Sequence, residues 1–230
     1  MTTMLLYIIG IVLMVVSLIV QARFRSKSKK YAQSALRNGM SGAEIASQML
    51  RDNGIYDVKV LHNPGQLTDH YNPADKTVNL SDEVFHGRST LAAAVAAHEC
   101  GHAVQHAEAY NWLEFRSNMV GPVSVSSKYL IFILIGGVLL GGVLGQTLLM
   151  IGIGLFTLTT MFAFVTLPVE FDASQRAMQW LTTKGLVVGQ EEVESRDALN
   201  WAAMTYVVAA LSSLATLLYY ISLFMGRSSD

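Results

Sequence analysis

The stretch that decides the fold is LLMIGIGLFTLTTMFAFVTLPVEFDASQRA, residues 148–177. Its first part, residues 148–167, has no charged side chain and is about as long as one membrane-spanning helix requires. The sequence then becomes polar at once, with Glu170, Asp172 and Arg176 following in quick succession. This pattern predicts a membrane helix that leads directly into a helix in water.

The composition of the whole chain agrees with a membrane protein. Of its 230 residues, 52% are hydrophobic and 14% are charged, whereas soluble domains usually carry about 25% charge. The net charge of −1 gives no general attraction to nucleic acid, so we expect no nucleic-acid partner. The single cysteine, Cys100, excludes an intramolecular disulfide framework and fits a site that faces a reducing compartment.

Three further apolar runs, residues 4–20, 129–144 and 202–225, bring the expected number of membrane spans to about four. The first run reads as an uncleaved anchor, because no positive residue precedes it and a basic cluster follows it. The second and third runs should form a tight antiparallel hairpin that turns at Gly145, Gln146 and Thr147. The basic cluster after the first run consists of Arg23, Arg25, Lys27, Lys29 and Lys30.

The run 129–144 is short and rich in glycine. Gly137 and Gly141 form a GxxxG pair, which would let a neighbouring helix approach closely, either in the same chain or in a homo- or hetero-oligomer. A flexible helix without a specific partner is the alternative.

The positive residues predict the orientation in the membrane. Fifteen of the sixteen Lys and Arg residues lie between the first and fourth spans, and only Arg227 lies beyond them. Positive charge gathers on the cytoplasmic side, so residues 21–128 and 168–201 should both be cytoplasmic, with both termini outside. The basic cluster could instead bind anionic lipid. We expect a multi-pass membrane protein with its polar segments on the cytoplasmic side.

The predicted fold class is therefore a mainly α membrane protein with a small α+β cytoplasmic domain. A capping box of Ser41 and Glu44 predicts a helix to about Arg51. Ser89 or Thr90 should cap a long alanine-rich helix over residues 91–109. Strands are expected at 55–61 and 77–80, with a turn at 73–75 before the second. The expected segments are an anchor (1–21), the α+β domain (22–127), the hairpin (128–167), a cytoplasmic helical segment (168–200) and a C-terminal membrane helix with a short tail (201–230).

The chemistry lies in the motif His98-Glu99-Cys100-Gly101-His102, an HExxH pattern on the helix predicted at 91–109. Histidines four positions apart share one helical face, so both imidazoles can reach one metal ion. Glu99 is offset by about 100° and approaches the open coordination position, where a general base belongs. The spacing predicts a catalytic zinc site with ligands His98 and His102 and base Glu99. Two packed histidines in an ordinary helix are the alternative.

A catalytic zinc needs a third protein ligand, and Glu170 is the best candidate. The hairpin returns the chain to the side of the HExxH helix, so Glu170 can meet both histidines. Its helical face carries Ala173, Ser174, Ala177 and Leu181, and the small residues among them would let the two helices pack tightly. Alternatively, Glu170 is a helix N-terminal acid that complements the helix dipole.

Three neighbouring residues have open roles. Pro168 can begin a new helix or kink the third span. His106 lies one turn too far along to be a ligand, and could donate a hydrogen bond in the transition state or simply line the cleft. Arg176 is a second candidate for that donor.

Several of these segments resemble the neutral zinc metallopeptidases of bacterial membranes, the YugP type. The resemblance covers the anchor with its basic tail, residues 69–73 (DHYNP), 97–105 (AHECGHAVQ) and 170–177 (EFDASQRA). It extends to gluzincins of the membrane CAAX-protease and heat-shock-protease kind, whose glutamate ligand belongs to an E-x-x-x-D motif. The resemblance implies a zincin-like domain in which His98, His102 and Glu170 bind Zn²⁺ and Glu99 is the base. It also implies a multi-pass protein of the bacterial inner membrane. Ser174 stands where the wider pattern has Asp, and Asp172 lies two positions earlier, so a role beside the metal stays open for both.

The predicted function is hydrolysis of peptide bonds in membrane or membrane-associated proteins, by a zinc-activated water with Glu99 as general base. The substrate peptide could pair with the strand at 77–80, or that strand could be an ordinary member of the sheet. The alternative function is a non-catalytic zinc-binding scaffold or adaptor. An ion-coupled transporter is disfavoured, because no charged residue lies in the middle of any expected span.

Overall fold

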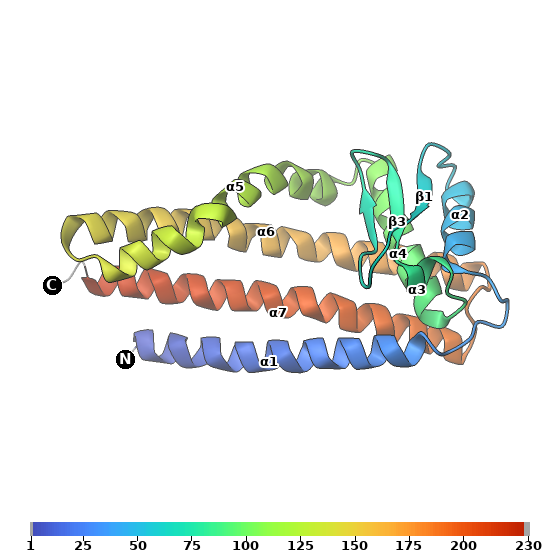
Figure 1. Ribbon diagram of the computed structural model, residues 1–230, viewed down its shortest axis with the longest axis horizontal. Helices are drawn as coiled ribbons and strands as arrows, with labels where there is room; N and C mark the ends of the chain where they lie inside the picture. The colour runs from blue at the N-terminus through green and yellow to red at the C-terminus, as the bar shows by residue number, and fades with distance from the viewer. Residues whose placement is uncertain (1, 228–230) are drawn as a thin grey trace. The chain divides into compact units, whose positions relative to one another are not determined.

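The computed structural model describes residues 2–227; Met1 and residues 228–230 of the predicted tail lie outside the described residues. This described part of the chain is mainly helical, with four helices long and apolar enough to cross a membrane and one small sheet, as the sequence predicts (Figure 1). The long helices are α1 (Thr2–Tyr31), α5 (Asn111–Leu139), α6 (Gly142–Thr183) and α7 (Gln190–Arg227). The short elements are α2 (Gly42–Asp52), β1 (Lys59–His62), β2 (His70–Asn72), β3 (Thr77–Leu80), α3 (Asp82–Phe85) and α4 (Thr90–Ala107).

The chain forms two compact units, and each long helix contributes to both. The first, here called the helical unit, comprises Met1–Val20, Phe115–Leu167 and Thr205–Asp230. The second, here called the site unit, comprises Gln21–Glu114 and Pro168–Met204.

The helical unit exposes many large apolar side chains. The most hydrophobic 18-residue segment of α1 contains no buried residue. Helices α5 and α6 also carry exposed Leu, Ile, Val and Phe side chains. The start of α1, the α5–α6 turn and the end of α7 lie at the same end of this unit (Figure 1). At that end the Ser222 hydroxyl lies 3.2 Å from the Thr3 hydroxyl. Apolar surface of this extent is typical of helices that lie in lipid.

The hairpin turn is not where the sequence predicted it. α5 ends at Leu139 and α6 begins at Gly142, so the prediction of a turn at residues 145–147 is wrong. The reversal uses a left-handed backbone at Gly142, with φ of +64°, which glycine adopts without steric cost. Gly137 lets α6 approach α5, because a Cβ there would lie 2.7 Å from the Leu149 nitrogen. Gly141 lies outside the helix, so the predicted GxxxG pair does not form one helical face.

The sheet of the site unit has the strand order β1-β3-β2. β1 runs parallel to β3, and β2 is antiparallel to β3 through the turn predicted at 73–75. β3 is therefore the central strand, with both edges already paired. The expectation that a substrate peptide pairs with residues 77–80 is wrong, because only β1 and β2 have an open edge. Strand order depends on pairing between distant segments, which a local pattern does not contain.

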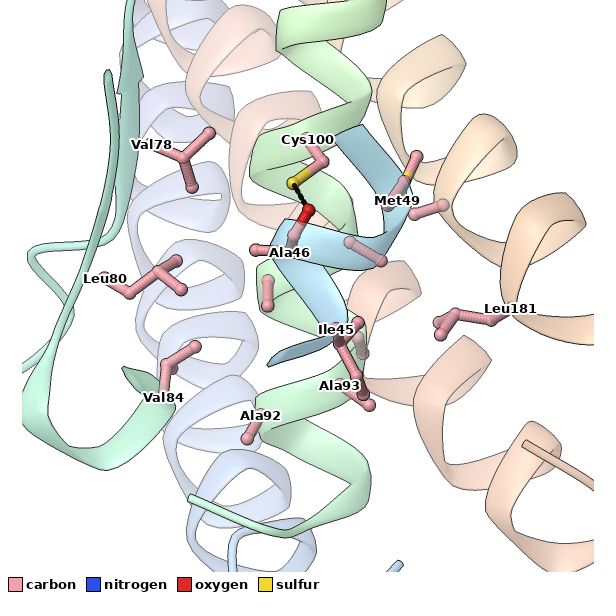
Figure 2. Close-up of a cluster of buried hydrophobic side chains, with 14 of the residues drawn as sticks. Ile45, Ala46, Met49, Val78, Leu80, Val84, Ala92, Ala93, Cys100 and Leu181 are labelled. Carbon is pink, nitrogen blue, oxygen red and sulfur yellow. Dashed lines mark hydrogen bonds between the residues drawn. The ribbon is translucent and has the colours of Figure 1, made fainter. Parts of the chain in front are cut away.

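A buried core joins α2, α4, α6 and the sheet. The predicted capping box is confirmed, since the Ser41 side chain accepts from the Glu44 amide and the Glu44 side chain accepts from the Ser41 amide. Figure 2 shows side chains from all four parts meeting around Ala46 and Cys100. The Cys100 thiol is buried and donates a 3.5 Å hydrogen bond to the Ala46 carbonyl oxygen, so it packs α4 against α2. The labelled members are Ile45, Ala46, Met49, Val78, Leu80, Val84, Ala92, Ala93, Cys100 and Leu181.

The first turn of α4 is held from several sides. Ser89 is the N-cap, and its side chain accepts from the Ala92 amide. The buried Thr90 hydroxyl lies 3.2 Å from both the Tyr31 carbonyl oxygen and the Glu194 carboxylate. The Ser195 hydroxyl donates to the Thr90 carbonyl oxygen. α4 is therefore fixed at its start by the end of α1 and the start of α7 within the site unit.

Candidate active site

The two motif histidines lie one turn apart in the middle of α4. The ring centroids of His98 and His102 are 4.8 Å apart and the ring planes are at 83° to each other. His102 is buried, and the His98 side chain is 13% exposed. Both rings are therefore largely removed from water while remaining close enough to share one ion.

A close approach of two helices brings Glu170 to these histidines. A Cβ added at Gly101 would lie 2.6 Å from the Ala173 carbonyl oxygen, so only glycine allows α4 to lie this close to α6. Ala173, Ala177 and Leu181 are fully buried on the contact face of α6. This confirms the predicted packing of small residues between the two helices.

Pro168 lies inside α6 and begins no new helix. Glu170 is therefore in the interior of a continuous helix and is not an N-terminal acid that complements a dipole. Its buried carboxylate lies 3.3 Å from His98 Nε2 through Oε2, and 3.8 Å from His102 Nε2 through Oε1.

The three side chains have the donors and spacing that zinc requires. One nitrogen of each histidine and one carboxylate oxygen of Glu170 all lie within 4.8 Å of one another. In a tetrahedral site with bonds of about 2.0–2.1 Å, the ligand atoms are about 3.3–3.4 Å apart. The 3.3 Å between His98 Nε2 and Glu170 Oε2 matches this spacing. The 3.8 Å from His102 Nε2 leads to the other carboxylate oxygen, Oε1, so a small turn of the carboxylate would complete the set.

Each histidine is also held through its other ring nitrogen. His98 Nδ1 lies 3.1 Å from the Ser174 hydroxyl, and His102 Nδ1 lies 3.0 Å from Gln105 Oε1. With Nδ1 donating to these oxygens, the lone pair of each Nε2 faces Glu170. Such partners fix the tautomer and the ring orientation of metal-binding histidines. Ser174 thus orients His98.

A buried network continues from Gln105 to the surface. Gln105 Nε2 donates to the Val169 carbonyl oxygen at 2.9 Å and to Asp172 Oδ2 at 2.7 Å. Arg176 in turn donates to Asp172 at 2.5 Å and to Glu108 at 2.6 Å. Asp172 and Arg176 therefore support Gln105 and join α4 to α6. These contacts tie Arg176 to two carboxylates, which does not favour it as a donor to substrate.

Glu99 is buried beside the histidines. Its Oε2 accepts a 2.9 Å hydrogen bond from the Tyr71 amide, on β2. Burial raises the pKa of Glu99 to about 7; the His98 ring acts against this shift and the Glu170 carboxylate acts with it. A carboxyl group with a pKa near 7 can both accept and release a proton at neutral pH.

A second polar pair lies farther along the same edge of α4. The Tyr71 hydroxyl lies 2.7 Å from His106 Nδ1, and their ring centroids are 5.8 Å apart. Burial raises the pKa of Tyr71 to about 12, so its hydroxyl keeps its proton and can donate. β2 is thus the edge strand that contacts the motif helix, through both the backbone and the side chain of Tyr71.

Sequence reasoning missed Tyr71 and Gln105 as site residues. Gln105 follows His102 by three positions, which places it on the same helical face, and this spacing is the one local signal it carries. Tyr71 belongs to the segment DHYNP that the family resemblance marked. Its position against α4 depends on the strand order, and no local pattern predicts that order.

Comparison with known proteins shows the class, zinc metallopeptidases, and the geometry of the site agrees with it. The family model described as "Putative neutral zinc metallopeptidase" matches residues 6–225, and the chain belongs to this family, whose cofactor is Zn²⁺. A similar relative is the "Putative membrane protease YugP" of Bacillus subtilis (strain 168), 41% identical over 211 residues, which cover 91% of this chain and 92% of the relative. No solved structure matches the chain.

Proposed function

We propose that the chain is a membrane-embedded zinc endopeptidase, with His98, His102 and Glu170 as the zinc ligands and Glu99 as the general base. The observation that carries this proposal is the convergence of two imidazole nitrogens and a buried carboxylate, with a second buried carboxylate beside them. A structural zinc site needs no such base, which favours an enzyme over a scaffold.

His98, His102 and Glu170 would hold the zinc ion, and that ion would supply Lewis acidity toward a water molecule and a substrate carbonyl. Glu99, beside the two histidines, would accept the proton of the attacking water as general base and return it to the leaving amine as general acid. The Tyr71 hydroxyl, paired with His106, donates a hydrogen bond to the developing negative charge on the carbonyl oxygen.

The substrate chain would lie along β2. In an antiparallel pair, the amide and carbonyl of one residue point to the same side, so the carbonyl of Tyr71 also points away from β3. The Tyr71 amide contacts Glu99, so this edge leads directly to the base. A peptide in extended form along β2 would therefore pass the base and the Tyr71–His106 pair together.

The substrates we propose are membrane proteins or membrane-bound segments, cleaved at the cytoplasmic face of the bacterial inner membrane. Glu170 follows the apolar run that ends at Leu167 by three residues, roughly 5 Å of helix. That is within the headgroup layer of a bilayer. The Lys and Arg bias supports a cytoplasmic orientation, because only Arg227 lies beyond the fourth span.

The test is Glu99→Gln in the full-length protein, reconstituted in bilayers. This change keeps the size of the side chain and removes its ability to accept a proton, so zinc content and thermal unfolding should be unchanged. Hydrolysis should fall by about 10²–10⁴-fold. Cleaved peptides should be compared across membrane fractions treated with wild type and with the variant. Equal products from both would reject Glu99 as the base, and no products from either would favour the scaffold.

A further inference from the structure

Three exposed side chains of the site unit, separate from His98, His102 and Glu170, also have the composition of a metal site. One ligand atom each from His62, Asp82 and His86 lies within 4.8 Å of the other two. His62 Nε2 lies 2.5 Å from Asp82 Oδ1, and the ring centroids of His62 and His86 are 5.5 Å apart. None of these residues takes part in the contacts of His98, His102 and Glu170 described above. We propose that His62, Asp82 and His86 bind a second divalent transition-metal ion.

The fold brings these three residues together at one end of the sheet. His62 is the last residue of β1 and pairs with Leu80, the last residue of β3. Asp82 begins α3 two residues later, and His86 follows Asp82 by four positions, one helical turn away. This spacing places Asp82 and His86 on one side of α3, facing the end of β1.

The position of α3 is itself fixed, so the cluster does not depend on a mobile segment. The Asp69 carboxylate accepts hydrogen bonds from the amide and the hydroxyl of Ser81, at 2.7 and 3.0 Å. The Asn63 amide donates to the Leu80 carbonyl oxygen at 2.8 Å, which holds the residue after His62 beside the end of β3. The backbones that carry the three ligands are therefore joined before any ion binds.

The donor set selects the class of ion. Two imidazoles and one carboxylate suit Zn²⁺, Ni²⁺, Co²⁺ or Cu²⁺, whereas Mg²⁺ and Ca²⁺ prefer oxygen ligands. The short contact of His62 with Asp82 must open to about 3.3 Å between ligand atoms to admit a tetrahedral ion. The Asp82 side chain is 63% exposed and the His62 side chain 36%, so both have room to turn.

The exposure of the ligands also predicts the strength and the effect of binding. Water competes for these side chains, so the ion should bind more weakly here than at the buried set of His98, His102 and Glu170. A bound ion would clamp β1 to α3 at the end of the sheet. Because β3 joins β1 to β2, the clamp would stabilise the sheet that presents Tyr71 to Glu99.

The test is a zinc titration of full-length protein, purified in detergent without a polyhistidine tag, with bound zinc measured by mass spectrometry after equilibrium dialysis. Wild type should bind a second, weaker zinc, and His62→Ala/His86→Ala should bind only the tight one. A protein with His98→Ala/His102→Ala should keep only the weak site. Asp82→Asn, which preserves size, should weaken that site by at least about 10-fold, since even outer partners of a metal ligand contribute that much.

The matched control is His70→Ala. His70 is an exposed histidine of the same unit, and its Nδ1 contacts the Thr68 carbonyl oxygen 2.8 Å away. The His70→Ala substitution should leave the zinc affinity of both sites unchanged. In NMR spectra recorded during the zinc titration, the imidazole ring resonances of His62 and His86 should shift together as the weak site fills. A wild type that saturates with one zinc, or a weak site that survives His62→Ala/His86→Ala, would overturn the proposal.

Discussion

Replacing Gly101 with alanine tests the packing that assembles the zinc site. A Cβ at this position would lie 2.6 Å from the Ala173 carbonyl oxygen, 3.1 Å from Ala173 Cα and 3.2 Å from its carbonyl carbon. All three atoms belong to the backbone of α6, so no side chain can rotate away. Attractive contacts between heavy atoms need about 3.5 Å or more. Even a tight contact of about 3.2 Å between the added Cβ and the Ala173 oxygen would require α4 and α6 to move apart by about 0.6 Å.

That displacement is large compared with what a metal site tolerates. Zinc–ligand distances hold to about 0.2 Å, and the histidines lie on α4 while Glu170 lies on α6. We expect Gly101→Ala to weaken zinc binding by at least about 10-fold, as the loss of an outer partner does. Overpacking should also lower the free energy of unfolding by about 1–3 kcal/mol.

Helix propensity predicts the opposite sign, which makes the result decisive. Alanine favours a helix over glycine by about 1 kcal/mol, so without the contact the variant would be more stable. Zinc affinity should be measured by competition with a chromophoric chelator, and stability by thermal unfolding of the zinc-free protein. Gly154→Ala in α6 is the control, because nothing lies within 4 Å of its added Cβ. A Gly101→Ala protein with raised stability and unchanged zinc affinity would refute the reasoning.

Two more predictions rest on the contacts around the site, and a third rests on the distribution of Lys and Arg. Gln105→Met should weaken zinc binding by about 10–100-fold in the competition assay, because His102 loses its orienting partner. The control Gln175→Met, at an exposed position, should leave the zinc affinity unchanged. Tyr71→Phe should lower kcat/KM by about 10²–10³-fold at unchanged zinc content, because the hydroxyl that stabilises the oxyanion is lost. The control Tyr56→Phe, at a residue that is 81% exposed, should have no effect, and equal rates for the two variants would remove Tyr71 from the mechanism. Reporter fusions after Lys30, Trp112 and Lys184 should all report a cytoplasmic location, and fusions after Gly141 and Asp230 should report the opposite side of the membrane. If the first three fusions reported different sides, the proposed orientation would be contradicted.

Those features of the fold that depend on neighbouring residues were predictable from the sequence. Four membrane-length helices follow from apolar runs, and the capping box of Ser41 and Glu44 is a contact between residues three positions apart. The hairpin turn was misplaced because hydropathy does not reveal that Gly142 adopts a left-handed backbone. The central position of β3 was missed because strand order is set by pairing across the chain.

The candidate site divides in the same way. His98, Glu99 and His102 follow from helical spacing, and Glu170 was reached by combining the expected hairpin with small residues on one helical face. Gln105 and Tyr71 were not predicted as site residues, because their contacts form only when α6 and β2 pack against α4. Their partners are 64 and 28 positions away in the sequence.

The central claim is that His98, His102 and Glu170 hold one catalytic zinc, and X-ray absorption at the zinc edge tests it most directly. Full-length protein and Glu170→Ala should first be dialysed against zinc-free buffer, which empties the weaker exposed site. Wild type should retain about one zinc per chain, with two imidazole nitrogens and one carboxylate oxygen at about 2.0–2.1 Å. Glu170→Ala should lose most of its zinc, and the remainder should lack the protein oxygen. Full zinc content with an unchanged spectrum in Glu170→Ala would contradict the account.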